Sequence, residues 1–249
     1  MNAPTPFPPE YGRLIAKLET IALLSDTEKA ALATLPLRIR SFKENADLVR
    51  QGEASPECCL IVEGFACRYK LLGEGQRQIM SFHIPGDIPD LQSLHLSTMD
   101  HSLGALTPVQ AAFIPHGPLN ELTRAFPGIA AALWRETLID AAIFREWLAG
   151  VGRRSAHQRI AHVICEVYVK MRSVGLTSGL GFELPVTQAE LADSLGLSAV
   201  HVNRVLQDLR RDGLIASRGK SIVIQDWERL QAAGDFEPGY LHLNRAQLA

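Results

Sequence analysis

The chain has 249 residues, of which 47% are hydrophobic and 21% are charged, as is typical of a well-packed globular protein with one large or two ordinary domains. No uncharged apolar run approaches the roughly 18 residues of a membrane-spanning helix, and the first residues lack the apolar core of a signal peptide, so we expect neither a membrane protein nor a secreted one. The net charge is −2, but residues 150–220 hold ten Lys and Arg against six Asp and Glu, so a basic excess lies in this segment.

The first half of the chain is expected to begin with helices and then to form strands. Residues 12–35 have the pattern of one or two amphipathic helices, with a capping box formed by Ser25 and Glu28. Residues 38–115 hold short apolar runs such as "CCLIVEG", "FACRYKLL" and "RQIMSFHI", separated by turns that contain Gly or Pro. Many short strands at regular spacing predict a small β-sandwich of the jelly-roll type.

A long helix is predicted after Pro127, because no Pro or Gly interrupts the chain from Ile129 to Ala149. The helix is apolar around most of its circumference, so it must be buried on two sides. One side fits against the sandwich, and a second copy of the helix is the simplest cover for the other. The alternative is a helix buried entirely inside one domain. The residues that we assign to the dimer interface are Ile129, Leu133, Asp140, Phe144 and Trp147.

Two short helices joined by a glycine are predicted within residues 187–215, after a hinge at 149–155 and a helix at 155–172. Thr187 and Glu190 form a capping box that starts the first helix, Gly196 ends it, and Ser198 caps the second. The second helix has an apolar stripe at Val202, Val205, Leu206 and Leu209. This is the helix-turn-helix plan, in which the second helix enters the major groove of DNA.

The outer side of the second helix and the hairpin that follows it are both polar and basic. The strand "LIAS" turns at residues 218–220 and returns as "SIVIQD", which predicts a wing whose cationic tip contacts phosphate. A plain helical hairpin with a solvated basic face is the alternative, but caps, glycine turn, apolar stripe and wing in this order favour DNA binding. The outward-facing residues of the second helix are Val200, His201, Asn203, Arg204, Gln207 and Arg211.

With these motifs in order, the chain resembles the Crp–Fnr family of bacterial transcription regulators over nearly its whole length. The matching segments are "DLVRQGE", "LIVEGFACRYK", "IMSFHIPGD", the long helix and "LPVTQAELADSLGLSAVHVNRVLQDLRRDGLI". The resemblance implies an α+β chain with a cyclic-nucleotide-binding-like sensory jelly roll at 1–125, a dimerisation helix and hinge at 126–152, a winged helix-turn-helix at 153–232 and a C-terminal tail at 233–249. It also implies a homodimer that binds a two-fold symmetric DNA operator in the cytoplasm and works with RNA polymerase.

The phosphate-binding part of the sensory domain departs from the family pattern. Members that bind cyclic AMP carry Gly-Glu after the "GD" turn and, further on, an arginine that neutralises the cyclic phosphate. Asp90 and Leu91 stand in place of the first pair, and His101 and Ser102 in place of the arginine and its neighbour. Because Asp90 would repel a phosphate and crowd its approach, we expect an effector other than cyclic AMP. The residues of this vestigial pocket are Gly86, Asp87, Asp90, Leu91, His101 and Ser102.

The second helix keeps only part of the base contacts that the resemblance implies. Arg204 matches the arginine that most members place on guanine, a contact worth about 1–3 kcal/mol of discrimination. Val200 stands where many members have Glu, and it can touch a thymine methyl group instead. The predicted DNA contacts are Thr187, Gln188, Ser198, Val200, His201, Asn203, Arg204, Arg211, Arg218 and Lys220.

No cofactor or metal is expected. Oxygen-sensing relatives hold an iron–sulfur cluster through N-terminal cysteines, whereas residues 1–57 of this chain contain none. Cys58 and Cys59 are adjacent on a strand and point to opposite faces, so all four cysteines are expected to be small buried hydrophobic residues, with a redox role left open. The histidines at 83, 95, 101 and 116 lack a ligand-spacing motif, so ordinary polar roles are favoured over haem or metal ligation.

Three classes of function compete for this sequence. An enzyme is disfavoured because the chain has no nucleophile, metal-ligand or phosphate-loop motif. A cyclic-nucleotide module that controls another protein is disfavoured by the winged helix. The sequence therefore predicts a DNA-binding homodimer, governed either by a ligand, redox or haem signal or by the protein's own abundance.

Overall fold

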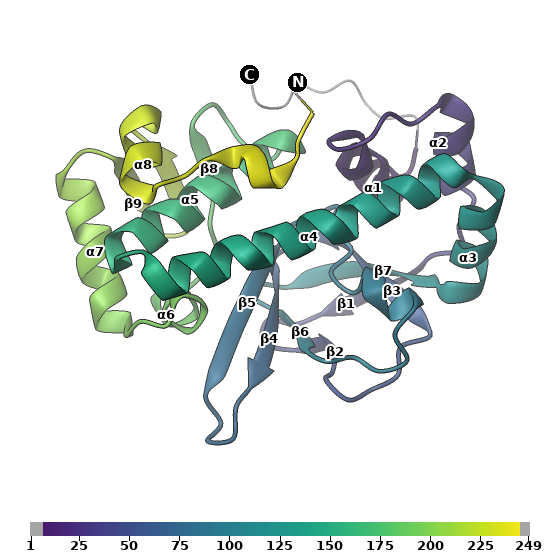
Figure 1. Ribbon diagram of the computed structural model, residues 1–249, viewed down its shortest axis with the longest axis horizontal. Coiled ribbons are helices and arrows are strands. Elements are labelled where there is room, and N and C mark those ends of the chain that lie inside the picture. Colours follow the sequence, from purple (N-terminus) through teal and green to yellow (C-terminus); the bar gives the residue numbers. More distant parts are fainter. Residues whose placement is uncertain (1–6, 245–249) are drawn as a thin grey trace.

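The structure is a computed structural model that describes residues 7–244. A β-sandwich and a winged-helix domain are joined by one long helix (Figure 1). One sheet has the order β1-β7-β3 and the other β2-β6-β4-β5, with antiparallel pairing throughout, which confirms the predicted sandwich. The strands are β1 Arg38–Phe42, β2 Asp47–Val49, β3 Glu57–Glu63, β4 Ala66–Leu71, β5 Arg77–His83, β6 Ser102–Ala105 and β7 Val109–Pro115.

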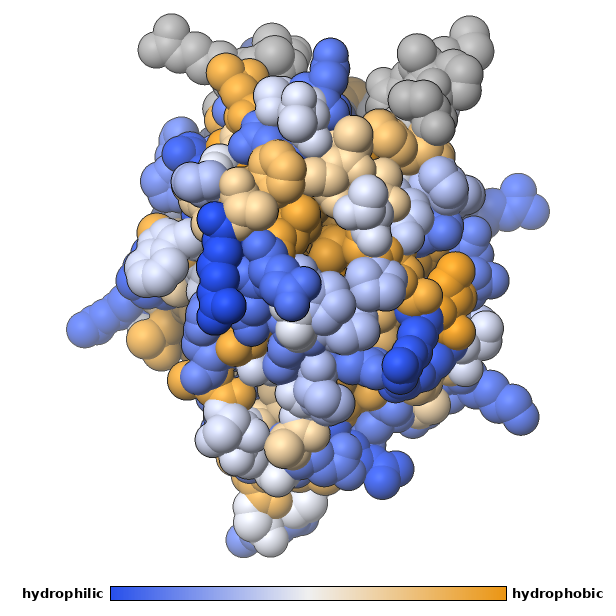
Figure 2. Space-filling model, turned by 90° about the vertical axis from the view of Figure 1, so that its right-hand side faces the viewer, coloured by the Kyte–Doolittle hydropathy of each residue, from blue (hydrophilic) through white to orange (hydrophobic). Residues whose placement is uncertain are grey.

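Strand β3 supplies a hydrophobic cluster on each of its faces, because side chains alternate along a strand. Cys59 and Ile61 point into the sandwich, while Cys58 and Leu60 pack under a layer of helices. The end of the molecule that carries α2 and α3 is mostly hydrophilic, with hydrophobic patches in between (Figure 2). The helices of this half are α1 Pro9–Glu19, α2 Asp26–Leu32, the 3₁₀ turn η1 Leu91–Leu94 and α3 His116–Ala125.

The long helix α4, Pro127–Arg153, continues through most of the predicted hinge at 149–155. Gly150 and Gly152 are helical, and only Arg154 and Ser155 separate α4 from α5, Ala156–Ser173. Most of the predicted hinge is therefore helical, because a helical glycine costs only about 1 kcal/mol and packing over a long helix outweighs it. The break between the two helices lies at Arg154 and Ser155, the last two residues of the predicted hinge. Ser155 and Gln158 form the capping box that starts α5.

The C-terminal domain has the predicted helix-turn-helix and wing, and β8 adds a third strand to the wing sheet, in the order β8-β10-β9. The described part of the predicted C-terminal tail at 233–249 packs against the rest of the chain, with Phe236 and Leu241 each only 2% exposed; residues 245–249 lie outside the described range. The elements are β8 Gly181–Glu183, α6 Gln188–Leu195, α7 Ala199–Arg211, β9 Ile215–Arg218, β10 Ser221–Ile224, α8 Trp227–Gly234 and the 3₁₀ turn η2 Pro238–Leu241.

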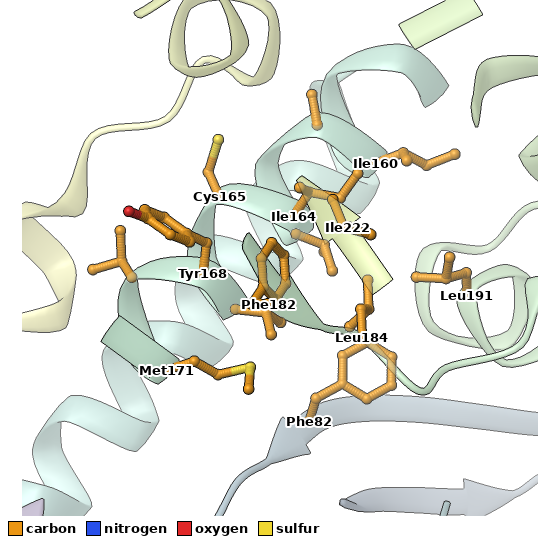
Figure 3. Packing of buried hydrophobic residues seen from close by; sticks show 14 of the residues in the cluster. Phe82, Ile160, Ile164, Cys165, Tyr168, Met171, Phe182, Leu184, Leu191 and Ile222 are labelled. Carbon is orange, nitrogen blue, oxygen red and sulfur yellow. The ribbon is translucent and has the colours of Figure 1, made fainter. Parts of the chain in front are cut away.

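A single hydrophobic cluster crosses from the sandwich into the winged helix. Figure 3 shows Phe82 of β5 beside Leu184, below the side chains of α5 and the wing sheet. Polar contacts follow the same boundary: Arg77 Nε donates to Asp193 Oδ2 of α6 over 2.9 Å. The β4–β5 hairpin is therefore the platform on which the DNA-binding half is docked.

Candidate nucleic-acid interface and sensory pocket

A left-handed glycine sets the turn between α6 and α7. Gly196 has φ +63° and ψ +43°, a conformation that glycine adopts without steric cost, and its N–H donates to the carbonyl oxygen of Ala192. The hydroxyl of Ser198 then accepts from the N–H of His201 over 3.2 Å and starts α7. Val202, Val205 and Leu209 of the apolar stripe are buried and Leu206 is half-buried, which confirms the predicted helix-turn-helix and turns the other side of α7 outward.

The outward side of α7 is a reading face, defined here as Val200, His201, Arg204 and Gln207. All four side chains are exposed, and Val200 is 72% exposed although it is apolar. An exposed apolar residue beside an exposed arginine, on the first turns of this helix, suits contact with base edges in a major groove. The base contacts of Arg204 and Val200 stay predictions that this exposure supports.

Asn203 uses both ends of its side-chain amide inside the protein. Its Nδ2 donates to Oε1 of Gln188 over 3.1 Å, and its Oδ1 accepts from Nε2 of Gln207 over 2.9 Å. These bonds leave one N–H and one lone pair of the amide for DNA, and they fix the orientation in which the amide would approach a base. Asn203 thus joins Gln188 of α6 and Gln207 of α7, and its DNA contact stays a prediction.

The predicted phosphate contacts differ in how far the protein already engages them. Arg218 and Lys220 are exposed on either side of the wing turn. Arg211 already forms ion pairs with Asp208 at 2.7 Å and with Asp212 at 3.2 Å, so a phosphate would have to compete with two carboxylates. The hydroxyl of Thr187 is also bonded within the protein, because it donates to Glu190 Oε2 in the capping box at the start of α6.

One of the predicted pocket residues, His101, is bonded to a buried arginine that the sequence reasoning missed. Arg68 of β4 is 3% exposed, and its guanidinium donates to His101 Nε2 over 3.1 Å, to Asp140 Oδ2 over 2.8 Å and to the carbonyl oxygen of Pro89. Burial and the charge of Arg68 lower the pKa of His101 to about 4, so the ring is neutral and accepts. Through this bond Asp140, which we assigned to the dimer interface, ties α4 to the sandwich. The available signal was a cation inside the apolar run "FACRYK".

Beside Arg68, four charged side chains from four parts of the chain form an ion cluster, defined as Lys17, Asp87, Glu136 and Lys170. Lys17 Nζ lies 3.0 Å from Asp87 Oδ1 and 3.3 Å from Glu136 Oε1. Lys170 Nζ lies 3.2 Å from Asp87 Oδ2 and donates to the carbonyl oxygen of Phe82 over 2.9 Å. Burial favours the neutral acid, but the two ammonium groups outweigh it and hold the pKa of Asp87 well below its usual range. The cluster thus joins α1, the sandwich, α4 and α5.

The space left at this position does not fit a cyclic nucleotide. The cavity among these groups has a volume of about 30 Å³. That is room for about one water molecule, whereas small-molecule sites measure roughly 300 Å³ or more. Gly86 shows why α1 can close the site: it has φ +102°, and a Cβ there would lie 3.0 Å from the carbonyl oxygen of Arg13 and from Cβ of Lys17. Ser102, another of the predicted pocket residues, is bonded within the protein, because its hydroxyl accepts from the N–H of Gln51 over 3.0 Å.

Asp90 points into the protein, which corrects the expectation that it faces a phosphate. Its side chain is fully buried, and Oδ1 accepts from the N–H of Cys59 over 2.7 Å. Oδ2 has no hydrogen-bond partner among the described residues. Burial raises the pKa of Asp90 to about 7. Leu91, the next residue, is buried at the start of η1.

Replacing Asp90 with Asn is expected to make the free energy of unfolding less dependent on pH between about 4 and 7. In this window the folded protein keeps the Asp90 proton that the unfolded chain, with a pKa of about 3.9, has lost. The wild type therefore loses up to about 1.4 kcal/mol of stability per pH unit as the pH rises towards 7. Asn still accepts from Cys59 and does not titrate. Urea unfolding of both proteins at pH 5 and pH 7 measures the free energy of unfolding. A difference between variant and wild type that is the same at both pH values contradicts a raised pKa for Asp90.

Three residues that we assigned to the dimer interface are buried within the single chain, so that assignment is wrong for them. Ile129, Leu133 and Trp147 are 0%, 5% and 8% exposed, and Trp147 Nε1 donates to the carboxylate of Glu166 over 3.1 Å. Helical periodicity cannot tell which of two apolar faces packs against the chain's own sandwich. Phe144 is half-buried, with the Arg68 guanidinium 5.2 Å from its ring centroid. The large apolar residues of α4 that are exposed are Trp134, Leu138, Leu148 and Val151.

The cysteines are buried, as expected for small hydrophobic residues. Burial raises the pKa of the Cys67 thiol to about 12 and also raises the pKa values of the Cys58 and Cys165 thiols, which keeps them protonated. Within residues 7–244 there is no group of three or more side chains that could hold a metal ion. None of the helices in this range is long and apolar enough to cross a membrane.

Two family models match separate parts of the chain. Residues 39–126 match a cyclic nucleotide-binding domain, and residues 158–233 match a Crp-like helix-turn-helix domain. The first covers the sandwich and α3, and the second covers α5 to α8.

Curated relatives and solved structures agree with these two matches. The transcriptional activator protein FnrL of Cereibacter sphaeroides is 28% identical over 221 residues, which cover 87% of this chain and 88% of that protein. The nitrogen fixation regulation protein FixK of Rhizobium meliloti is 27% identical over 198 residues, covering 79% and 87%. The structure of FixK2 from Bradyrhizobium japonicum has the same fold, with a TM-score of 0.71 and 24% identity over 80% of this chain and 98% of that one.

Proposed function

Because the chain belongs to the Crp–Fnr family of transcription regulators, we propose that it binds an inverted-repeat DNA operator as a homodimer, with no requirement for cyclic AMP. The observation that carries this proposal is the exposed reading face of α7, which includes Arg204, together with the exposed cations Arg218 and Lys220 on the wing of the same domain. Two modules related by a two-fold axis would read half-sites about 34 Å apart, each with a guanine for Arg204.

The effector part of the proposal rests on the side chains that fill the sensory pocket. Arg68 supplies a buried positive charge at this position, and the ion cluster occupies the neighbouring space. An incoming cyclic phosphate would have to displace Asp140 and Pro89 from Arg68. We therefore favour control by the abundance of the protein over control by a small ligand.

The proposal is tested by selecting bound sequences from a random duplex library, with protein purified without any added ligand. Enrichment of an inverted repeat with one guanine per half-site, unaffected by added cyclic AMP, is the expected result. No enrichment from a folded dimer would overturn ligand-independent binding. It would favour the alternative, a sensor whose DNA binding requires a redox, haem or other signal.

Dimerisation is proposed to use the exposed face of α4. Trp134 and Leu138 are 68% and 53% exposed, and they border an apolar hollow of about 500 Å³ formed with η1 and α3. An exposed apolar surface of this kind marks an interaction site, and the same face of a second copy is the occupant that the family membership supports.

The double variant Trp134→Glu/Leu138→Glu is expected to convert the dimer to a monomer, because two carboxylates on each copy would be buried against each other. Sedimentation velocity measures the mass. Leu72→Glu is the matched control, since Leu72 is a similarly exposed leucine at the tip of the β4–β5 hairpin. A wild-type mass that is already monomeric, or a double variant that stays dimeric, would rule out this interface.

RNA polymerase is the protein partner that completes the proposal. The relative FnrL is named a transcriptional activator, and an activator acts by assisting the polymerase at a promoter. We assign the chain no enzymatic activity.

A further inference from the structure

The last described residues, 235–244, form a C-terminal strap that lies beyond the helix-turn-helix match, which ends at residue 233. After α8 the strap runs back over α4 towards the N-terminal helices (yellow in Figure 1). Phe236 and Leu241 anchor it in the hydrophobic cluster that crosses the two domains. Nothing in the proposed DNA contact requires these residues.

The start of the strap holds the junction between α4 and α5. Arg154, the first of the two residues between these helices, donates from Nε to Asp235 Oδ2 over 3.1 Å and from Nη2 to the Asp235 carbonyl oxygen over 3.2 Å. The same guanidinium donates to Glu146 of α4 over 2.5 Å. Gly234, the last residue of α8, lets the chain pass close to α5 where the strap begins, because a Cβ there would lie 2.7 Å from the backbone nitrogen of His162.

The middle of the strap joins a buried polar network. The hydroxyl of Tyr240 donates to Glu166 Oε2 over 2.6 Å and lies 3.0 Å from Nε2 of His162, with the two rings stacked. Glu166 also accepts from Trp147 of α4. One carboxylate of α5 therefore binds both α4 and the strap.

The far end of the strap is attached to the sensory half of the chain. The N–H of Asn244 donates to the carbonyl oxygen of Thr20 over 2.8 Å, and its Nδ2 donates to the carbonyl oxygen of Glu19 over 2.9 Å. The strap thus begins on the DNA-binding domain, crosses α4 and ends at the C-terminal end of α1. Its bonds span the one short linker about which the two halves could rotate.

We propose that this strap fixes the orientation of the DNA-binding domain before DNA arrives, and so preorganises the reader. This inference rests on the proposed function. A strap that blocked DNA would cover the reading face, whereas Val200 and Arg204 are exposed with the strap in place. Fixing a binding-competent orientation lowers the ordering cost of association. The strap performs the task that an effector performs in a ligand-gated switch.

Two truncations test the proposal: one after Gly234, which removes the strap, and one after Asn244, which leaves it intact. The shorter protein is expected to exchange backbone hydrogens faster at residues 150–160. If its competent orientation is populated about a tenth of the time, its dissociation constant for the selected operator rises about tenfold. The longer truncation is expected to match the full chain in both measurements. Unchanged exchange, or operator binding that is unchanged or tighter after strap removal, would overturn the proposal.

A point variant keeps the test decisive if the shorter truncation does not fold. Tyr240→Phe keeps the ring and removes the hydrogen bond to Glu166, and Tyr11→Phe is its control, because Tyr11 donates to the carbonyl oxygen of Leu35 away from the strap. Faster exchange at residues 150–160 is expected for Tyr240→Phe alone, and equal exchange in both variants would overturn the strap's role. Hydrogen exchange needs no DNA, so it tests the strap separately from the proposed function. A wild type that selects no operator would contradict the proposed function, and the exchange measurement would still test the strap.

Discussion

Replacing Arg204 with Ala will abolish sequence-specific DNA binding and leave weak non-specific binding. The side chain is exposed on the first turns of α7, where a guanidinium can bond both O6 and N7 of guanine. Each such contact is worth about 1–3 kcal/mol of discrimination, so two half-sites together lose about 2–6 kcal/mol. Attraction to phosphate does not depend on Arg204 and persists.

Competition between the selected operator and scrambled duplex measures this loss directly. Arg211→Gln is the informative comparison, because Arg211 lies on the same helix and is predicted to bind phosphate. It should weaken binding to both duplexes equally and lower the slope of the salt dependence by about one unit for each phosphate that is no longer neutralised. An Arg204→Ala protein that still prefers the operator would show that other residues carry the specificity.

Replacing Asp87 with Ala will destabilise the protein by about 3–5 kcal/mol, because it leaves buried Lys17 and Lys170 without their shared carboxylate. At about 2–4 °C per kcal/mol for a chain of this size, the midpoint of thermal unfolding falls by roughly 6–20 °C. Calorimetry of the full chain measures it.

Asp193→Ala is the control for Asp87→Ala, since Asp193 also joins the two domains but pairs with Arg77 near the surface. A pair of that kind contributes about 1 kcal/mol or less. The pKa of Asp87 is held below its unfolded value, so its stabilisation is complete above about pH 4 and is lost as the pH falls through the folded pKa. The stability gap between wild type and Asp87→Ala should therefore narrow in acid. If Asp87→Ala and Asp193→Ala lower the free energy of unfolding equally, the ion cluster contributes no more to stability than an exposed ion pair.

The sequence predicts the elements of this protein better than their mutual packing, because local signals specify elements. Thr187 with Glu190, the glycine at 196 and the stripe of α7 act within a few residues of each other, and the structure has each of them. The glycines at 150 and 152 lie in the predicted hinge but are helical, because their low helix propensity is a weak local signal that the packing of α4 overrides.

The sensory pocket was predicted only in part, because its chemistry comes from distant parts of the chain. Asp90 and His101 were recognised as departures from the family pattern. Arg68, which donates to His101, lies on another strand, and Lys17, which pairs with Asp87, lies on the first helix. Nothing in the neighbourhood of Lys17 in the sequence indicates that its ammonium group is buried against two carboxylates. The same holds for α4, whose two apolar faces are equivalent by periodicity and differ only in which one the sandwich covers.

The hydrophobic cluster shared by β5 and the winged helix has a consequence for how this regulator can evolve. Domain shuffling works when a recombined module carries a complete surface of its own. Here Phe82 of the sandwich and Leu184 of the DNA-binding domain pack together across the boundary. A DNA-binding domain moved to another protein would therefore expose Leu184 and lack the surface that covers it. New operator preferences are thus more accessible through single substitutions on the outer turns of α7 than through the exchange of whole domains.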